Sequence, residues 1–89
     1  MFNMQPLRIK VTAEDIRLGE RNTTSACPIA RRLKASYKPK SLCVDSNKIE
    51  MFFKTGTVTF EPDKAITKFI EEFDKGMSVK PQTFTLKIS

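Results

Sequence analysis

The sequence predicts a single α+β domain over residues 1–89, built as two layers. One layer is a mostly antiparallel five-stranded sheet, and about three helices cover one of its faces. Two observations predict this class. Five short segments alternate apolar and polar residues, which is typical of strands with one buried face. Other segments carry helix-start signals and apolar residues at helical spacing. The expected order is β-α-α-β-β-β-α-β, with a radius of gyration of about 12 Å.

The first strand leads directly into the first helix. Residues 7–11 alternate apolar and basic side chains, so they form a half-buried strand. Thr12 and Asp15 have the spacing of a capping box, with Asp where Glu or Gln is usual. Gly19 is the expected stop of this helix.

The second helix is expected from Pro28 to about Tyr37, after a polar loop over residues 20–25. Proline suits the first turn of a helix because its missing N–H would have no partner there. Pro39 ends the helix because it disfavours helical geometry at Lys38.

The remaining elements are three strands, a helix and a final strand. Residues 42–44, 49–53 and 57–60 alternate and are separated by turn signals, so they form consecutive hairpins. A third amphipathic helix opens near Pro62 and ends at Gly76. Its start could shift by one or two positions, because Glu61 is a poor cap residue. Residues 83–88 alternate polar and apolar side chains and form the last strand.

The basic charge of the chain is concentrated in one segment. There are 16 basic and 10 acidic residues, a net charge of +6. Residues 1–20 and 45–89 are each neutral, whereas residues 21–44 hold six basic residues and no acid. Positive side chains gathered on one surface are what phosphate contacts need. The primary candidate site, for nucleic acid or an acidic host protein, is therefore Arg21, Arg31, Arg32, Lys34, Lys38 and Lys40. Arg31, Lys34 and Lys38 are expected to form a solvent-facing ridge of the second helix.

The outer face of the sheet is a secondary candidate. Basic side chains around an aromatic on a sheet suit base stacking. The residues expected there are Arg8, Lys10, Phe52, Lys54 and Lys87. Only Phe52 is aromatic, and it could instead be covered by Met1, Phe2 and Met4 or by a second copy of the chain. The alternative function is therefore a self-associating structural protein, so the chain is expected to be a monomer or a homodimer.

Composition argues against catalysis and metal binding. The chain has no His, which removes the usual general base and a common metal ligand. Its two Cys residues are too few for a four-cysteine zinc site. Cys27, at a helix start, could be an activated thiol, but no base accompanies it and a capping role is favoured. We expect no enzymatic activity, cofactor or metal, and a Cys27 enzyme is the least favoured alternative.

No signal sequence or apolar run suggests export or membrane insertion. The expected location is therefore the cytoplasm, with both thiols reduced.

Several short motifs resemble a group of uncharacterised proteins encoded by bacteriophages and prophages. The shared features are Val-Thr-x-x-x-Ile at residues 11–16, Cys-Pro-Ile-Ala at 27–30, and Phe-Asp-x-Gly at 73–76. The resemblance covers most of the chain and supplies no catalytic or binding residues. It implies a small accessory protein that acts on a host macromolecule in the bacterial cytoplasm.

Overall fold

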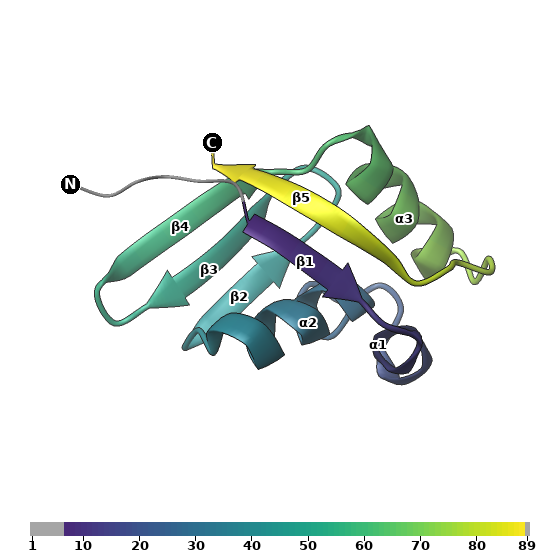
Figure 1. Ribbon diagram of the computed structural model, residues 1–89, viewed down its shortest axis with the longest axis horizontal. Helices are drawn as coiled ribbons and strands as arrows, with labels where there is room; N and C mark the ends of the chain where they lie inside the picture. The colour runs from purple at the N-terminus through teal and green to yellow at the C-terminus, as the bar shows by residue number, and fades with distance from the viewer. Residues whose placement is uncertain (1–6, 89) are drawn as a thin grey trace.

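The structure of the protein is a computed structural model that describes residues 7–88. Five strands and three helices follow the predicted order, which confirms the α+β class (Figure 1). The elements are β1 (Leu7–Val11), α1 (Ala13–Leu18), α2 (Pro28–Tyr37), β2 (Ser41–Val44), β3 (Ile49–Phe53), β4 (Gly56–Glu61), α3 (Lys64–Asp74) and β5 (Gln82–Ile88). The radius of gyration is 12.3 Å, as the chain length predicts.

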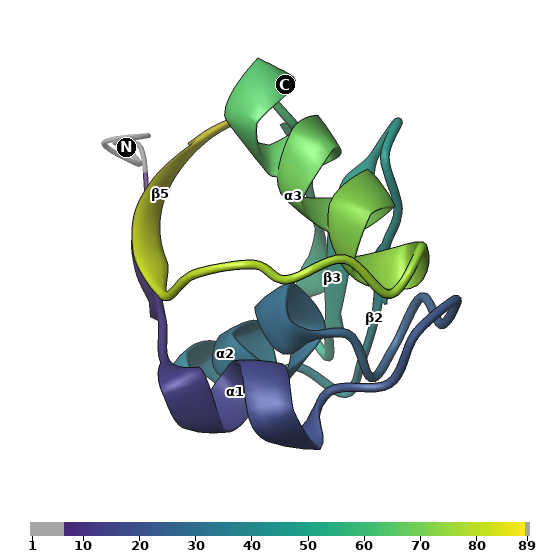
Figure 2. The same ribbon diagram turned by 90° about the vertical axis from the view of Figure 1, so that its right-hand side faces the viewer.

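The five strands form one sheet in the order β1-β5-β4-β3-β2, and every neighbouring pair is antiparallel. β1 and β5 pair along the full length of β1. Within residues 7–88, β4 and β5 pair only at Phe60–Ile88 and Glu61–Lys87. The two halves of the sheet diverge from this seam, so the sheet curls around the core (Figures 1 and 2).

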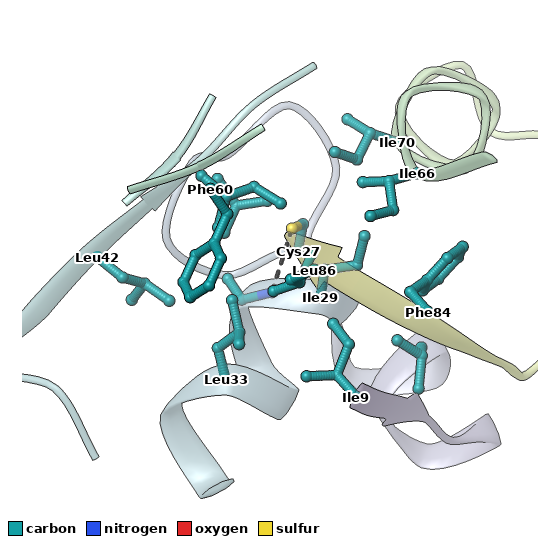
Figure 3. Close-up of a cluster of buried hydrophobic side chains, with 14 of the residues drawn as sticks. Ile9, Cys27, Ile29, Leu33, Leu42, Phe60, Ile66, Ile70, Phe84 and Leu86 are labelled. Atoms are coloured by element: carbon teal, nitrogen blue, oxygen red, sulfur yellow. Dashed lines mark hydrogen bonds between the residues drawn. The ribbon is translucent and has the colours of Figure 1, made fainter. Parts of the chain in front are cut away.

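α2 and α3 lie on the concave side of the curled sheet, and α1 packs against α2 (Figure 2). α2 packs against both β1 and β2, the two edge strands, and so closes the gap between them. α3 lies across the core from α1 and α2 (Figure 2). Ile29 and Leu33 of α2, Ile66 of α3 and Phe60 of β4 are fully buried in one cluster (Figure 3). Burial of these side chains is the main source of the stability of the fold.

Each helix is preceded by a residue whose side chain caps it. In α1, the Thr12 N–H donates to Asp15 Oδ2 (2.9 Å) and the Asp15 N–H donates to Thr12 Oγ1 (3.2 Å). The predicted capping box is therefore confirmed. Cys27 caps α2. α3 begins at Lys64, two residues after Pro62, because the Asp63 carboxylate accepts the N–H of Ile66 (2.9 Å).

Gly19 ends α1 as expected, but for a different reason. Its φ is −69°, so it does not adopt the left-handed conformation that usually favours glycine. A Cβ at this position would lie 2.8 Å from Pro28 Cδ and 2.9 Å from the Asp15 carbonyl oxygen. Glycine is therefore required by the close approach of the end of α1 to the start of α2.

Replacing Gly19 with alanine is expected to lower the free energy of unfolding by about 1–3 kcal/mol, the usual effect of overpacking. Urea denaturation followed by circular dichroism measures this change. Ser25→Ala, at an exposed position of the same connection, is the control and should stay within about 0.5 kcal/mol of the wild type. Equal unfolding midpoints for Gly19→Ala and the wild type would contradict the close-packing argument.

Candidate nucleic-acid interface

The six basic residues of the primary candidate site do not share one surface. Arg31 and Arg32 interact with Asp15 of α1. Arg21 lies beside Gly76, where its guanidinium carbon would be 3.4 Å from an added Cβ. The three lysines, Lys34, Lys38 and Lys40, are exposed in the second half of α2 and the turn that follows it.

The interaction of Arg31 and Arg32 with Asp15 joins α2 to α1. Arg32 Nε donates to Asp15 Oδ2 (3.0 Å) and Arg32 Nη2 donates to Oδ1 (3.4 Å). Arg31 Nε lies 3.9 Å from Oδ1 and is buried without a hydrogen-bond acceptor among the described residues. The Asp15 side chain is only 4% exposed. This carboxylate therefore offsets one unit of positive charge at Arg31 and Arg32 and leaves Lys34 and Lys38 unaffected.

The pKa of the Asp15 carboxyl is lowered from its ordinary value. Burial by itself would raise it. Hydrogen bonds from the Thr12 N–H and hydroxyl and from Arg32, together with the positive charge of Arg32, stabilise the carboxylate and outweigh burial. Asp15 is therefore ionised at neutral pH and acts as a structural anchor between the two helices.

A hollow of about 420 Å³ lies between α1 and α2 beside this ion pair. Three of its lining residues are acidic and three are basic: Glu14, Asp15, Glu20, Arg31, Arg32 and Lys34. The prediction of an exposed ridge of Arg31, Lys34 and Lys38 is therefore wrong for Arg31, which is half-buried against α1. The segment 21–44 has no acid of its own, but the fold places acids of residues 14–20 against it. A phosphate backbone in this hollow would meet carboxylates as well as cations.

Basic residues from both candidate sets meet at another place, which we call the basic corner: Lys38, Lys40, Lys54 and Phe52. The N–H of Lys40 donates to the carbonyl oxygen of Phe52 (2.8 Å), which brings the end of α2 beside β3. Phe53 pairs with Gly56, so Lys54 lies in the tight turn between β3 and β4. All three lysines are exposed, and Phe52 is half-buried.

Carboxylates are scarce around the basic corner. Residues 37–41 and 52–57, which form this end of the sheet, include no acid. On the outer face of β3, Glu50 lies two residues from Phe52. Its Oε1 is 3.2 Å from Lys48 Nζ, and its Oε2 accepts the Thr59 hydroxyl (3.4 Å). The corner is therefore a locally positive surface, with its adjacent carboxylate already paired.

The other members of the secondary set lie apart from Phe52. Arg8 and Lys10 are on β1, opposite Thr85 and Thr83, and Lys87 of β5 is opposite Glu61. β1 and β5 lie in the half of the sheet away from the β3–β4 turn (Figure 1). These cations therefore do not surround Phe52. Met1, Phe2 and Met4, proposed above as an alternative cover for Phe52, lie outside the described residues.

Cys27 has the capping role that the sequence favours. It is 3% exposed, and its Sγ accepts the N–H of Ala30 (3.4 Å). Burial raises the pKa of the thiol, which is the reverse of what a nucleophile requires. Cys43, on β2, is half-buried, and both thiols are free. The structure therefore gives Cys27 the environment of a core residue.

Cys27 is expected to react slowly with a thiol reagent while the protein is folded. In a Cys43→Ser variant, which leaves Cys27 as the sole thiol, the native rate near neutral pH should be at least about tenfold below the rate in urea. The Cys27→Ser variant, which retains the half-buried Cys43, is the comparison. If Cys27 reacts as fast in the folded protein as in the unfolded chain, the result would support the alternative of an enzyme that uses Cys27 as a nucleophile.

Neither a cluster of potential metal ligands nor a helix able to span a membrane is found within residues 7–88. No group of three or more potential ligands is assembled there. None of the helices in this part of the chain is both long and apolar enough to cross a bilayer. No family model, curated protein or solved structure matches the chain. The geometry of the chain's own residues is therefore the basis for its function.

Proposed function

We propose that this domain is a non-enzymatic nucleic-acid-binding protein whose contact surface is the basic corner. The observation that carries the proposal is the backbone hydrogen bond between Lys40 and Phe52. It joins the turn after α2 to β3 across the β2–β3 hairpin, and Lys54 follows β3, so the backbones of three exposed lysines lie near that of one half-buried aromatic residue. By its resemblance to short phage-encoded proteins, we further propose that the binding takes place in the cytoplasm of a bacterial host.

Nucleic acid fits the corner better than an acidic protein does. Protein interfaces are usually centred on buried aromatic, Met or Arg side chains. The large hydrophobic residues exposed on the described part of the chain are Leu18 and Met77, on α1 and after α3, away from the corner. Interfaces with nucleic acid are more polar and more positive. Lysines around one aromatic side chain match that chemistry.

The proposal is tested by fluorescence anisotropy with a labelled oligothymidylate and a duplex of equal length at low salt. In the corner variant, Lys38, Lys40 and Lys54 are all replaced by Gln. The control variant replaces Lys64, Lys68 and Lys75, which are exposed in and after α3, so that it loses the same charge elsewhere. We expect binding by the wild type and about a tenfold or larger loss of affinity in the corner variant, because phosphate contacts dominate such binding.

Two results would contradict the proposal. Equal losses in the corner and control variants would mean that binding follows net charge and not this surface. Failure of the wild type to bind either probe at low salt would exclude nucleic acid. Binding of a polyglutamate peptide in that case, lost in the corner variant, would identify an acidic protein as the class of partner.

A further inference from the structure

We infer that the basic corner selects single-stranded nucleic acid by stacking an unpaired base on Phe52. The inference rests on the proposed function and names its ligand class. Three features carry it: the face on which Phe52 lies, the small neighbours of its ring, and the positive charge around it.

Phe52 lies on the outer face of the sheet. Its neighbours along β3 point inward, because Met51 is 2% exposed and Phe53 packs against the core cluster. Side chains alternate between faces along a strand, so Phe52 projects away from the core. Phe52 is absent from the hydrophobic residues that pack against this cluster. The ring is therefore not needed to fill the described core.

The residues beside Phe52 in the sheet leave space at the flanks of its ring. Ser41 of β2 and Thr57 of β4 are its register partners, and both are small, polar and exposed. An aromatic ring between short side chains on an open sheet surface offers a platform for a base.

The positive charge around Phe52 favours a ligand that carries phosphates as well as a base. Lys38, Lys40 and Lys54 are exposed, and each lies within two residues of the hydrogen-bonded pair Lys40–Phe52. In the inferred complex, these long side chains contact the phosphates of a strand whose base rests on the ring. A paired base in a duplex has its faces stacked within the helix and cannot reach Phe52. A duplex therefore gains only the phosphate contacts, whereas a single strand gains stacking as well.

Variants of Phe52 test this inference on the full-length chain. Phe52→Leu keeps an apolar side chain but removes the aromatic face, and Phe52→Tyr keeps that face. We expect about a tenfold loss of oligothymidylate affinity in Phe52→Leu, retention in Phe52→Tyr, and unchanged duplex affinity in both. Circular dichroism and thermal unfolding verify that each variant is folded.

A tryptophan at the same position gives a direct readout of stacking. The chain contains no Trp, so Phe52→Trp introduces a single fluorophore. Its emission should be that of a partly solvent-accessible indole in the free protein, because position 52 is half-buried. Oligothymidylate should quench it, and the duplex should not.

Each contrary outcome has a distinct meaning. If the lysine variant loses binding but Phe52→Leu binds both probes as the wild type does, the inference is overturned and the proposed function stands. If the wild type binds neither probe, both are overturned. Emission from the Phe52→Trp variant that is typical of a buried indole and unchanged by oligonucleotide would show that the chain itself or a second copy covers this position. Sedimentation of a dimer that Phe52→Leu converts to a monomer would identify the second copy.

Discussion

Replacing Phe60 with alanine is expected to lower the free energy of unfolding by about 3–5 kcal/mol. Phe60 is fully buried at the centre of the core (Figure 3). Its strand position also pairs with Ile88 at the short seam between β4 and β5. The substitution therefore leaves a cavity at the place where the two halves of the sheet are joined. The free energy of unfolding of a chain of this length is about 4–13 kcal/mol in total, so the variant should be close to unfolding.

Urea denaturation of Phe60→Ala measures this loss, with Val58→Ala as the matched control. Val58 is on the same strand and inner face but is only half-buried, so its truncation should cost about 1 kcal/mol. Similar losses in the two variants would contradict the central position of Phe60 in the core.

Removing the Asp15 carboxylate is expected to lower the free energy of unfolding by about 2–4 kcal/mol at neutral pH. Asp15→Ala removes one half of the capping box of α1, in which the carboxylate accepts the Thr12 N–H. It also leaves Arg32 without its hydrogen-bond acceptor and Arg31 without the carboxylate of its ion pair. Loss of one partner of a fully buried ion pair costs about 3–5 kcal/mol, and the effect here is smaller because Arg32 is 29% exposed.

The cost of Asp15→Ala should also depend on pH. The folded protein lowers the pKa of Asp15, so the unfolded chain takes up a proton first as the pH falls. The stabilisation from this ionised group is complete above its unfolded pKa of about 3.9. It disappears as the pH falls through the lower folded pKa. The difference in stability between wild type and Asp15→Ala should therefore be largest near neutral pH and narrow in acid.

Chemical denaturation of both proteins at neutral pH and at about pH 3 tests this linkage. Glu14→Gln is the control, because the ion pair between Glu14 and Arg17 is 4.0 Å long and both side chains are more than two-thirds exposed. Glu14→Gln should change the free energy of unfolding little at either pH. If Asp15→Ala is less stable than the wild type by the same free energy of unfolding at both pH values, the carboxylate charge does not contribute to stability.

Local signals in the sequence were sufficient for the elements and their order, and for most of their ends to within two residues. Thr12 and Asp15 predict the start of α1 because a capping box needs only residues three positions apart. Pro28 predicts the start of α2 for a similar reason. The alternation along β3 also places Phe52 on the outer face, since side-chain direction in a strand has a period of two.

The candidate site could not be assembled from those signals. Asp15 and Arg32 are 17 positions apart, and their interaction depends on how α1 packs on α2. The same packing removes Arg31 from the expected ridge. Lys40 meets Phe52 because β2 pairs with β3 in one register, and a shift of one residue would change their alignment. Charge counted along the chain predicts neither the packing of α1 on α2 nor the register of the β2–β3 hairpin.

The salt dependence of oligothymidylate binding tests the account most directly. If Lys38, Lys40 and Lys54 each neutralise one phosphate, log K should fall with log salt with a slope of about −2, from roughly −0.7 per contact on a single strand. The variant with Gln at all three positions should then have a slope near zero. The α3 control, with Gln at 64, 68 and 75, should keep the wild-type slope. Parallel slopes for the wild type and the corner variant would show that these lysines do not contact the phosphates, and would contradict nucleic-acid binding at the basic corner.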